Sequence, residues 1–313
     1  MLLDTASLYF RAFFGVPDSF RGPDGTPVNA VRGLLDFIAR LVDIYSPTHL
    51  VCCWDNDWRP HWRVELIPSY KAHRVAQSGD TVVSEMSSSP GTAGETAPDA
   101  LAVQVPLILA VLDALGIAVV GKDGYEADDV IGTLASTATM PVDVVTGDRD
   151  LFQLVDDERD VRVLYIARGV GNHERVTRDW VRAKYDIEPR QYADFATLRG
   201  DSSDGLPGVA GVGEKTAATL LNRFDDMAGI VTAAHDPDSD MGPGPRGKLK
   251  AAADYLEVAP TVVAVARDIE FGTADLALPR VPRDPDALAE LADRWSLTSA
   301  VDRLRLALAD DGT

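Results

Sequence analysis

Residues 124–150, GYEADDVIGTLASTATMPVDVVTGDRD, decide how this chain folds. Their first half, from Gly124 to Ala135, has the spacing of a helix, and its first turn carries Glu126, Asp128 and Asp129. Their second half, VDVVTGD, is an apolar run of strand length that leads to Asp148 and Asp150. Ligands gather at the carboxyl ends of strands in open parallel sheets. We therefore expect these acidic side chains to meet at one edge of a sheet.

The same alternation of strands and helices extends toward the N-terminus. Strands are predicted at LLD, HLVCCWD and IAVV, and helices at AVRGLLDFIARLVDIY and at VPLILAVLDALG, which ends at Gly116. This alternation favours a parallel α/β sheet flanked by helices. Two of the strands end in Asp4 and Asp55, so carboxylates recur at successive strand ends.

The pattern becomes entirely helical near Thr177, which is a suitable N-cap for RDWVRAKY. Two helical stripes follow, and they consist of Tyr192, Phe195 and Leu198 and of Ala217, Leu220, Leu221 and Phe224. Further helices are predicted at GKLKAAADYLEVA, DALAELADRW and SAVDRLRLAL, with DPDSDMGPGPRG as an exposed connection. The chain is therefore predicted to form an α/β domain over 1–176, a helical domain over 177–275 and a C-terminal helical segment over 276–313.

Bulk composition places the chain among globular proteins. Its 313 residues exceed a single comfortable core, and 46% hydrophobic with 25% charged residues disfavours a disordered chain. No apolar run approaches the ~18 residues of a membrane helix, so we expect a cytoplasmic protein without a membrane partner and, by default, a monomer. Cys52 and Cys53 are adjacent in a strand and point to opposite faces, which disfavours a disulfide framework or a cysteine zinc site.

The formal net charge of −19 argues at first against a nucleic-acid partner, because phosphate binding draws its affinity from Lys and Arg. Part of the excess belongs to the acidic cluster, which bound cations would neutralise, and much of the rest lies in segments such as DPDSD and ALADD. Binding to a nucleic acid must then use local basic patches and be strongly salt-dependent.

A long insertion over residues 58–100 separates the second strand from the next helix. Its first half is basic and aromatic and contains Arg59, His61, Trp62, Arg63, Tyr70, Lys71, His73 and Arg74. Its second half, QSGDTVVSEMSSSPGTAGETAPD, has the composition of a flexible segment. Beside a metal site such an insertion is usually an arch or lid that grips substrate, and a plain surface loop is the alternative.

Nine carboxylates make up the candidate metal site: Asp4, Asp55, Glu126, Asp128, Asp129, Asp148, Asp150, Asp201 and Asp204. Each has a simpler interpretation, because Asp is common in turns and acidic residues in a first helical turn complement the helix dipole. Their recurrence at four strand ends favours the metal site. Clustered carboxylates raise one another's pKa, and oxygen-only ligands favour Mg²⁺ or Mn²⁺ over zinc.

Residues 200–224, GDSSDGLPGVAGVGEKTAATLLNRF, place a glycine-rich turn between two helical stripes. Such a turn exposes backbone N–H groups to an anion at a helix N-terminus, which is how a helix-hairpin-helix holds a nucleic-acid backbone without reading bases. The alternative is a turn that only packs two helices together. The residues concerned are Gly208, Gly211, Gly213, Lys215 and Thr216.

With these segments assembled, the chain resembles the 5′ nuclease family, which comprises flap endonucleases and 5′-3′ exonucleases, including the nuclease domain of bacterial DNA polymerase I. Four blocks carry the resemblance in family order over residues 1 to about 270: IPSYKAHR, GYEADD, TGDRDLFQL and GDSSDGLPGVAGVGEKTA. The resemblance implies a PIN-like sheet joined to a helix-hairpin-helix domain. It also implies that the nine carboxylates bind two or more Mg²⁺ or Mn²⁺ ions, and it allows for K⁺ at the helix-hairpin-helix.

The resemblance further assigns roles to individual side chains. The expected catalytic residues are Lys71, Arg74 and Asp128. The expected DNA contacts, besides the glycine-rich turn, are Arg11, Arg63, Tyr70, Lys71 and Arg74. Stacking on an unpaired base is an interpretation for Tyr70, Trp58 or Trp62, and packing in the core is an equal alternative.

Two positions depart from the family pattern. Thr5 stands where a glycine usually follows the first Asp, and Gly205 stands where an Asn usually follows Asp204. Asp4 lies so close to the start that the first strand is short, which leaves an initiation site further upstream as an open alternative. No polymerase domain follows, which suggests a stand-alone nuclease.

The expected activity is structure-specific hydrolysis of DNA by a two-metal mechanism with water as the nucleophile. The substrates would be 5′ flaps, nicks and free 5′ ends in replication and repair, and the products would carry a 5′-phosphate and a 3′-hydroxyl. One rival is an α/β metal nuclease that cleaves RNA and is not expected to carry the block at 201–217. The other is a helix-hairpin-helix DNA-binding protein whose carboxylates are only structural.

Overall fold

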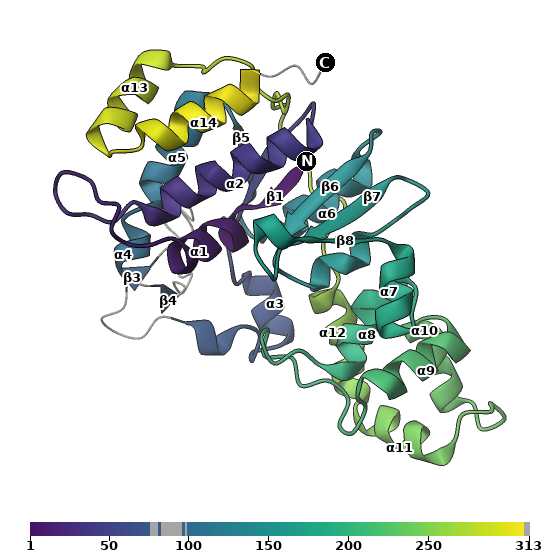
Figure 1. The fold of residues 1–313 in the computed structure, drawn as a ribbon. Coiled ribbons are helices and arrows are strands. Elements are labelled where there is room, and N and C mark those ends of the chain that lie inside the picture. Colours follow the sequence, from purple (N-terminus) through teal and green to yellow (C-terminus); the bar gives the residue numbers. More distant parts are fainter. Residues whose placement is uncertain (76–80, 83–95, 98, 310–313) are drawn as a thin grey trace.

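A computed structural model describes residues 1–75, 81–82, 96–97 and 99–309 of the chain (Figure 1). Most of the second half of the insertion, and with it the question of its order without DNA, lies outside the described residues. None of the helices in the described ranges is long and apolar enough to cross a membrane.

A six-stranded sheet forms the centre of the first domain. Its strands are β1 (Leu2–Asp4), β2 (Val51–Trp54), β5 (Ala118–Gly121), β6 (Val142–Thr146), β7 (Val161–Tyr165) and β8 (Glu174–Val176), in the order β5-β2-β1-β6-β7-β8. All neighbours are parallel except β8, which runs antiparallel to β7. The four predicted strands are confirmed. The parallel sheet is only partly correct, because the antiparallel pair β7–β8 was not predicted.

Helices cover both faces of this sheet. One face packs against α1 (Thr5–Gly15), α2 (Asn29–Tyr45) and α5 (Val105–Leu115), and the other against α6 (Ala127–Thr137). Neighbouring strand residues alternate between the two cores, since Cys53 lies in the core beside α6 and Cys52 in the core beside α2. Both thiols are buried and free, as predicted. Gly116 ends α5 at φ 82°, a conformation that L side chains rarely adopt.

The helical domain contains α7 (Arg178–Tyr185), α8 (Tyr192–Arg199), α9 (Glu214–Phe224), α10 (Met227–His235), α11 (Pro243–Ala251) and α12 (Ala253–Val263). Thr177 caps α7 through its side chain, and the two predicted apolar stripes lie on α8 and α9. Two predictions are wrong. The helix expected at GKLKAAADYLEVA is divided between α11 and α12, and the expected exposed connection is already helical from Pro243, with Met241 buried before it.

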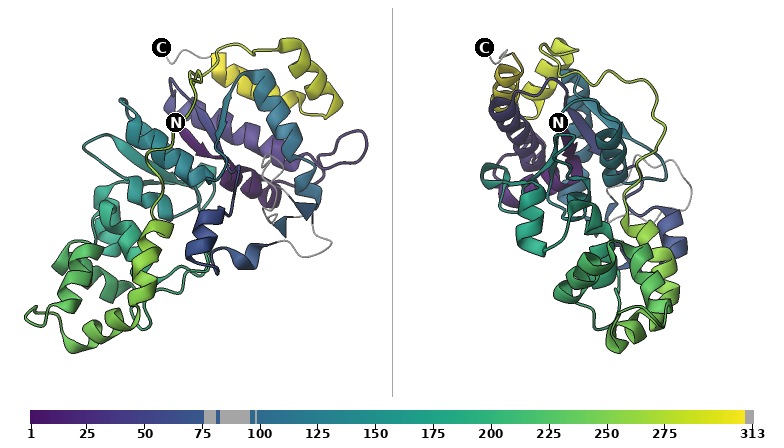
Figure 2. Two further views of the ribbon diagram at one scale, coloured as in Figure 1. Left: turned by 180° about the vertical axis from the view of Figure 1, so that it is seen from behind. Right: turned by 90° about the vertical axis from the view of Figure 1, so that its right-hand side faces the viewer.

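The last two helices, α13 (Pro285–Arg294) and α14 (Thr298–Ala309), return to the first domain (Figure 2). They pack in the same core as α2 and α5. Figures 1 and 2 show them at the opposite end of the molecule from the helical domain. Leu288, Leu297 and Leu304 are buried there, so this segment belongs structurally to the α/β domain.

The basic half of the insertion packs against the helical domain. The described part of the insertion contains α3 (His61–Leu66), the 3₁₀ turn η1 (Ala72–Arg74), the antiparallel pair β3 (Thr81–Val82) and β4 (Thr96–Ala97), and α4 (Asp99–Ala102). Arg63 donates to the Val262 carbonyl at 3.0 Å, and the Ser69 hydroxyl donates to the Gly205 carbonyl at 2.8 Å. The basic half of the insertion is therefore fixed to the helical domain and is not a plain surface loop.

Candidate metal centre

Three neighbouring parallel strands deliver carboxylates to one edge of the sheet. Asp4 ends β1 and accepts hydrogen bonds from the Ser7 N–H at 3.1 Å and the Thr146 hydroxyl at 2.7 Å. Asp55 follows β2 and accepts from the Ala127 N–H at 2.8 Å, at the start of α6. Asp148 follows β6. The sheet order β2-β1-β6 thus places residues from distant parts of the sequence side by side.

A cavity of about 280 Å³ lies at this edge. Its walls contain five of the predicted carboxylates, namely Asp4, Asp55, Glu126, Asp128 and Asp148. Lys71 and Arg74 from the insertion line the same cavity, together with Phe10 of α1 and Trp58. The convergence expected from the strand ends is therefore present, and two cations also line the acidic pocket.

Burial and mutual repulsion make it hard for this cluster to carry its full charge. Burial, aided by the charges of Asp4 and Glu126, raises the pKa of Asp55 to about 7. Burial and the neighbouring charges of Asp4 and Asp148 hold the pKa of Asp128 well above its usual range. Burial also raises the pKa of Asp148. A bound cation would relieve this repulsion and allow the carboxylates to ionise at neutral pH.

A second acidic group borders the first and joins the two domains. Asp150 begins a short 3₁₀ turn after β6, and burial together with the charges of Asp148 and Asp204 raises its pKa. Asp201 precedes the glycine-rich turn. Burial acts to raise its pKa, but hydrogen bonds from Ser203 and the nearby Arg199 guanidinium lower it overall, so Asp201 stays ionised.

Asp129 does not face this cavity, and neither does Arg63. The Arg63 guanidinium makes a bidentate pair with the two Asp129 oxygens, both at 2.7 Å, and both residues are buried. The remaining acceptor positions of Asp129 take the backbone N–H groups of Glu126 and Ala266. Its oxygens are thus already engaged, and Arg63, which is 2% exposed, does not reach the surface where DNA would lie. The predictions of a metal ligand at 129 and a DNA contact at 63 therefore do not fit the structure.

Glu126 connects this buried pair to the insertion. It accepts hydrogen bonds from Arg63 at 3.1 Å, from the Tyr70 hydroxyl at 2.7 Å and from the Lys71 ammonium. Tyr70 is 4% exposed and lies in the core beside α6, which favours packing over base stacking for this ring. Trp62 likewise has a structural contact, because its indole N–H donates to the Gly124 carbonyl at 3.1 Å.

Arg74 and Arg11 remain close to the cavity mouth. Arg74 donates to the Ser203 carbonyl at 2.7 Å and to Asp204 at 3.1 Å. Arg11 and Arg74 line an adjoining hollow of about 630 Å³ with Phe10, Phe14 and Asp148. The buried Arg11 Nε has no hydrogen-bond partner among the described residues. Both cations thus lie where an anionic substrate would pass.

The glycine-rich turn connects α8 to α9, as predicted. Gly208 has φ 66° and packs so closely on the Arg199–Gly200 backbone that a Cβ atom would lie 2.5 Å from the Gly200 nitrogen. Gly211 has φ 73°, and Gly213 is the N-cap of α9 with no atom within 4 Å of an added Cβ. Lys215 lies in the first turn of α9, whose N-terminal N–H groups receive no side-chain cap. Gly208 thus shapes the turn, while Gly213 leaves its open side accessible.

The two departures from the family pattern have local explanations. Gly205 has φ 70°, and a Cβ atom there would lie 2.1 Å from the Ser69 carbonyl oxygen. An Asn at this position would therefore collide with the backbone of the insertion at Ser69. Thr5 is fully buried in the first turn of α1, and its hydroxyl donates to the Leu3 carbonyl at 3.3 Å.

The donor set fits a hydrated hard cation. Within the described ranges, no three His, Cys, Asp or Glu side chains converge closely enough to hold an ion by themselves. Mg²⁺ keeps several of its waters and is usually bound by one or two carboxylates together with substrate phosphates. The buried Asp150 Oδ1 accepts no hydrogen bond from the described residues, which is unusual for a carboxylate unless a cation or water completes it. The site therefore fits a hard divalent cation held partly through water.

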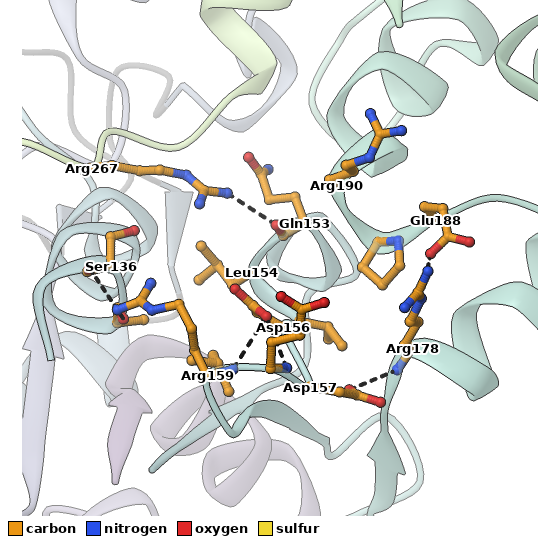
Figure 3. A pocket seen from close by; sticks show the side chains of 15 residues that line it. Ser136, Gln153, Leu154, Asp156, Asp157, Arg159, Arg178, Glu188, Arg190 and Arg267 are labelled. Carbon is orange, nitrogen blue, oxygen red and sulfur yellow. Dashed lines mark hydrogen bonds and ion pairs between the residues drawn. The ribbon is translucent and has the colours of Figure 1, made fainter. Parts of the chain in front are cut away.

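A larger hollow of about 700 Å³ lies elsewhere, between the C-terminal end of α6 and the start of the helical domain (Figure 3). Its cations are used to tie the elements together: Arg267 donates to the Gln153 carbonyl, Arg178 pairs with Glu188, and Arg159 donates to the Ser136 carbonyl (Figure 3). None of the nine carboxylates lines it. Its size therefore does not make it the functional site.

Several residues that support the site escaped the sequence reasoning. The Thr146 hydroxyl, at the end of β6, donates a hydrogen bond to Asp4 at the end of β1. The Arg199 guanidinium donates to Asp201 at 3.1 Å. Thr146 carries a weak signal, since it stands in the TGDRD segment directly before Asp148. Arg199 carries no such sequence signal, because its contact with Asp201 depends on how the chain turns after α8.

An acidic pocket at the carboxyl edge of a parallel sheet, with cations beside it and a glycine-rich turn on an adjacent helical domain, defines the class of metal-dependent nucleases. Two family models match the chain: "5′-3′ exonuclease, N-terminal resolvase-like domain" over residues 1–186 and "5′-3′ exonuclease, C-terminal SAM fold" over residues 187–285. The chain belongs to the 5′-3′ exonuclease family.

Curated relatives agree with this assignment. The chain is 60% identical to a 5′-3′ exonuclease of Streptomyces coelicolor, over 97% of this chain and 98% of the relative, and 48% identical to a 5′-3′ exonuclease of Mycobacterium tuberculosis, over 98% and 97%. It is also 37% identical to DNA polymerase I of Mycobacterium tuberculosis, where it spans 32% of the longer protein.

Solved structures share the fold at low sequence identity. A T5 D15 protein co-crystallised with metal ions matches with a TM-score of 0.62 and 16% identity, over 99% of both chains. Human GEN1 in complex with Holliday junction DNA matches with a TM-score of 0.62 and 17% identity, over 98% of this chain and 70% of that one. These matches confirm the predicted α/β sheet with an attached helical domain.

Proposed function

We propose that this protein is a structure-specific 5′ nuclease that hydrolyses DNA phosphodiesters at 5′ flaps, nicks and free 5′ ends. The observation that carries the proposal is the acidic cavity at the ends of β1, β2 and β6, with Lys71 and Arg74 on its wall. Family membership supports the same activity, because the relatives matched over nearly their whole length are named 5′-3′ exonucleases.

The carboxylates divide into two groups that would each hold a divalent ion, Mg²⁺ or Mn²⁺. The first group lines the cavity and consists of Asp4, Asp55, Glu126, Asp128 and Asp148. The second consists of Asp150, Asp201 and Asp204, and Asp129 is left out because Arg63 occupies it. When bound, two such ions supply activation of water and stabilisation of the leaving oxygen. T5 5′-exonuclease, which shares this fold, binds divalent metal ions (zinc), and this supports metal use in general.

The chain's own residues bind and orient the substrate. Lys71 is paired with Glu126, and Arg74 is paired with Asp204. These ion pairs hold both cationic side chains at the cavity before DNA binds. A phosphate entering the cavity would compete for these cations, which would then face the charge that develops on the transferred group. Arg11 extends the positive wall into the neighbouring hollow. Asp128, which lines the same cavity as Lys71, completes the proposed catalytic set.

We assign separate tasks to the parts of the chain. Residues 1–176 would cut the strand, the arch at about 58–100 would admit a 5′ end, and residues 177–275 would hold duplex backbone through Gly211, Gly213, Lys215 and Thr216. The family resemblance also allows for a K⁺ ion at this turn. We also propose that the protein acts as a monomer in the cytoplasm, in DNA replication and repair.

The test is digestion of a labelled 5′-flap DNA with and without Mg²⁺ or Mn²⁺, with both product ends mapped. The expected result is metal-dependent cutting near the junction that leaves a 5′-phosphate and a 3′-hydroxyl. Asp148→Asn should abolish it, because it removes a charge from the cavity with little change in size. Preference for single-stranded RNA would support the RNA nuclease instead, and undiminished cutting by Asp148→Asn would overturn the role of the cluster.

A further inference from the structure

The glycine-rich turn receives a cation from another helix. The Lys248 ammonium of α11 donates a hydrogen bond to the Gly211 carbonyl at 2.7 Å. Its side chain lies so close to the turn that a Cβ atom on Gly211 would come within 3.0 Å of the Lys248 Nζ. Lys248 is itself exposed, so one face of the ammonium meets the turn and the other faces solvent.

A turn that offers N–H groups to a phosphate must also turn some carbonyl groups outward. Each outward carbonyl oxygen carries partial negative charge and opposes an approaching anion, so a cation bound to it helps binding. A lysine ammonium has three N–H donors. At Lys248 one of them is used by Gly211, and two remain for water or for a phosphate oxygen.

We infer that Lys248 supplies a fixed positive charge to the glycine-rich turn and is a positioning residue for the DNA duplex. It fixes Gly211 so that the neighbouring N–H groups face outward, and it adds a positive charge where the backbone phosphate sits. The inference rests on the proposed function. It also makes a K⁺ ion at the turn unnecessary, because the Lys248 ammonium supplies the positive charge at the Gly211 carbonyl.

Other cations near the turn have different tasks. Arg199 pairs with Asp201 at 3.1 Å and with Glu214 at 3.3 Å, and Arg246 donates to the carbonyl groups of Ala234, Ser239 and Met241. Lys250 lies two residues beyond Lys248 on α11, where the helical rotation of about 100° per residue turns it to another side. It makes no ion pair or hydrogen bond with the described residues, and it is therefore a matched control.

The experiment measures binding of a dumbbell DNA, a duplex closed at both ends that offers no free 5′ end, over a range of salt concentrations. Lys248→Met, Lys250→Met and Lys248→Arg are compared with the wild type. Because one phosphate contact contributes a salt exponent of about 0.9, Lys248→Met should weaken binding roughly five- to tenfold at about 0.1 M salt and lower the slope by about 0.9. Lys250→Met should have a clearly smaller effect, and Lys248→Arg should keep most of the affinity.

Two further readouts separate positioning from folding. On a 5′-flap substrate, Lys248→Met should raise KM and leave kcat unchanged, because Lys248 lies on the helical domain and does not line the acidic cavity. At equal ionic strength, wild-type affinity should be the same in K⁺ and in tetramethylammonium, and K⁺ should restore part of the affinity of Lys248→Met. Melting temperatures of the variants should equal that of the wild type.

The inference is overturned if Lys248→Met binds like Lys250→Met, if Lys248→Arg fails to restore binding, or if the wild type itself requires K⁺. A wild type that neither binds the dumbbell nor cuts the flap would instead refute the proposed function. A wild type that cuts normally beside a Lys248→Met variant without any defect refutes this inference alone.

Discussion

Replacing Arg63 by Met tests whether this arginine supports the fold or contacts DNA. The structure buries its guanidinium against Asp129, with two contacts of 2.7 Å, and against Glu126 at 3.1 Å. The Arg63 side chain is 3% exposed and that of Asp129 is 0% exposed. Removing one partner of such a pair leaves a charge without compensation in the core, which costs about 3–5 kcal/mol.

The effect should be visible as a loss of stability with no loss of DNA affinity in the folded fraction. A change of 1 kcal/mol shifts the melting temperature of a domain of this size by about 2–4 °C, so Arg63→Met should melt roughly 10 °C lower. Urea unfolding gives the free energy directly. The control is Arg303→Met, which breaks the half-exposed pair with Asp36 at 2.6 Å and should cost no more than about 1 kcal/mol.

A double-mutant cycle identifies the partner. Because Asp129→Asn removes the stranded charge and keeps the oxygen that caps α6, Arg63→Met with Asp129→Asn should be less destabilised than the sum of the single changes, by about 0.5–3 kcal/mol. If Arg63→Met melts like the wild type and instead weakens DNA binding, the side chain lies at the surface, and the buried pair described above is wrong.

The remaining predictions concern the metal site and the turn. Because the pKa of Asp55 is raised from 3.8 to about 7, folding of the metal-free protein is favoured by protonation, and its stability should fall as pH rises between those values. Melting in a chelator should therefore be higher near pH 5.5 than near pH 8, with Mg²⁺ removing most of the difference; the opposite order would contradict the shift. In Asp148→Asn the Mg²⁺-induced rise in melting temperature should shrink, and an unchanged rise would exclude Asp148 as a ligand. Gly208→Ala should destabilise the helical domain, since φ 66° and a contact of 2.5 Å leave no room for Cβ. Gly213→Ala, with no atom within 4 Å of Cβ, should keep the fold and weaken only DNA binding; equal stability of the two variants would refute this distinction.

Strands and helices with strong periodicity were predictable because their signals are local. VDVVT and VCCW are short apolar runs, and α5 ends at the glycine where its apolar pattern stops. The elements that were missed lack such a boundary. β7 follows an acidic turn, and α1 begins at Thr5, directly after β1 ends at Asp4, so the chain passes from strand to helix without a linker.

The sequence by itself determined the chemistry available to this protein: acidic residues at successive strand ends, cations in the insertion and a turn that only glycine can form. Tertiary structure decided which of these groups are free. Asp128 and Asp129 are neighbours in one helical turn, yet Asp128 lines the cavity and Asp129 is sealed against Arg63. The spacing of two residues along a helix fixes the angle between them, whereas the partner that each one meets depends on how α3, α6 and α12 pack. Only that packing separates a residue available to a cation from one already compensated in the core.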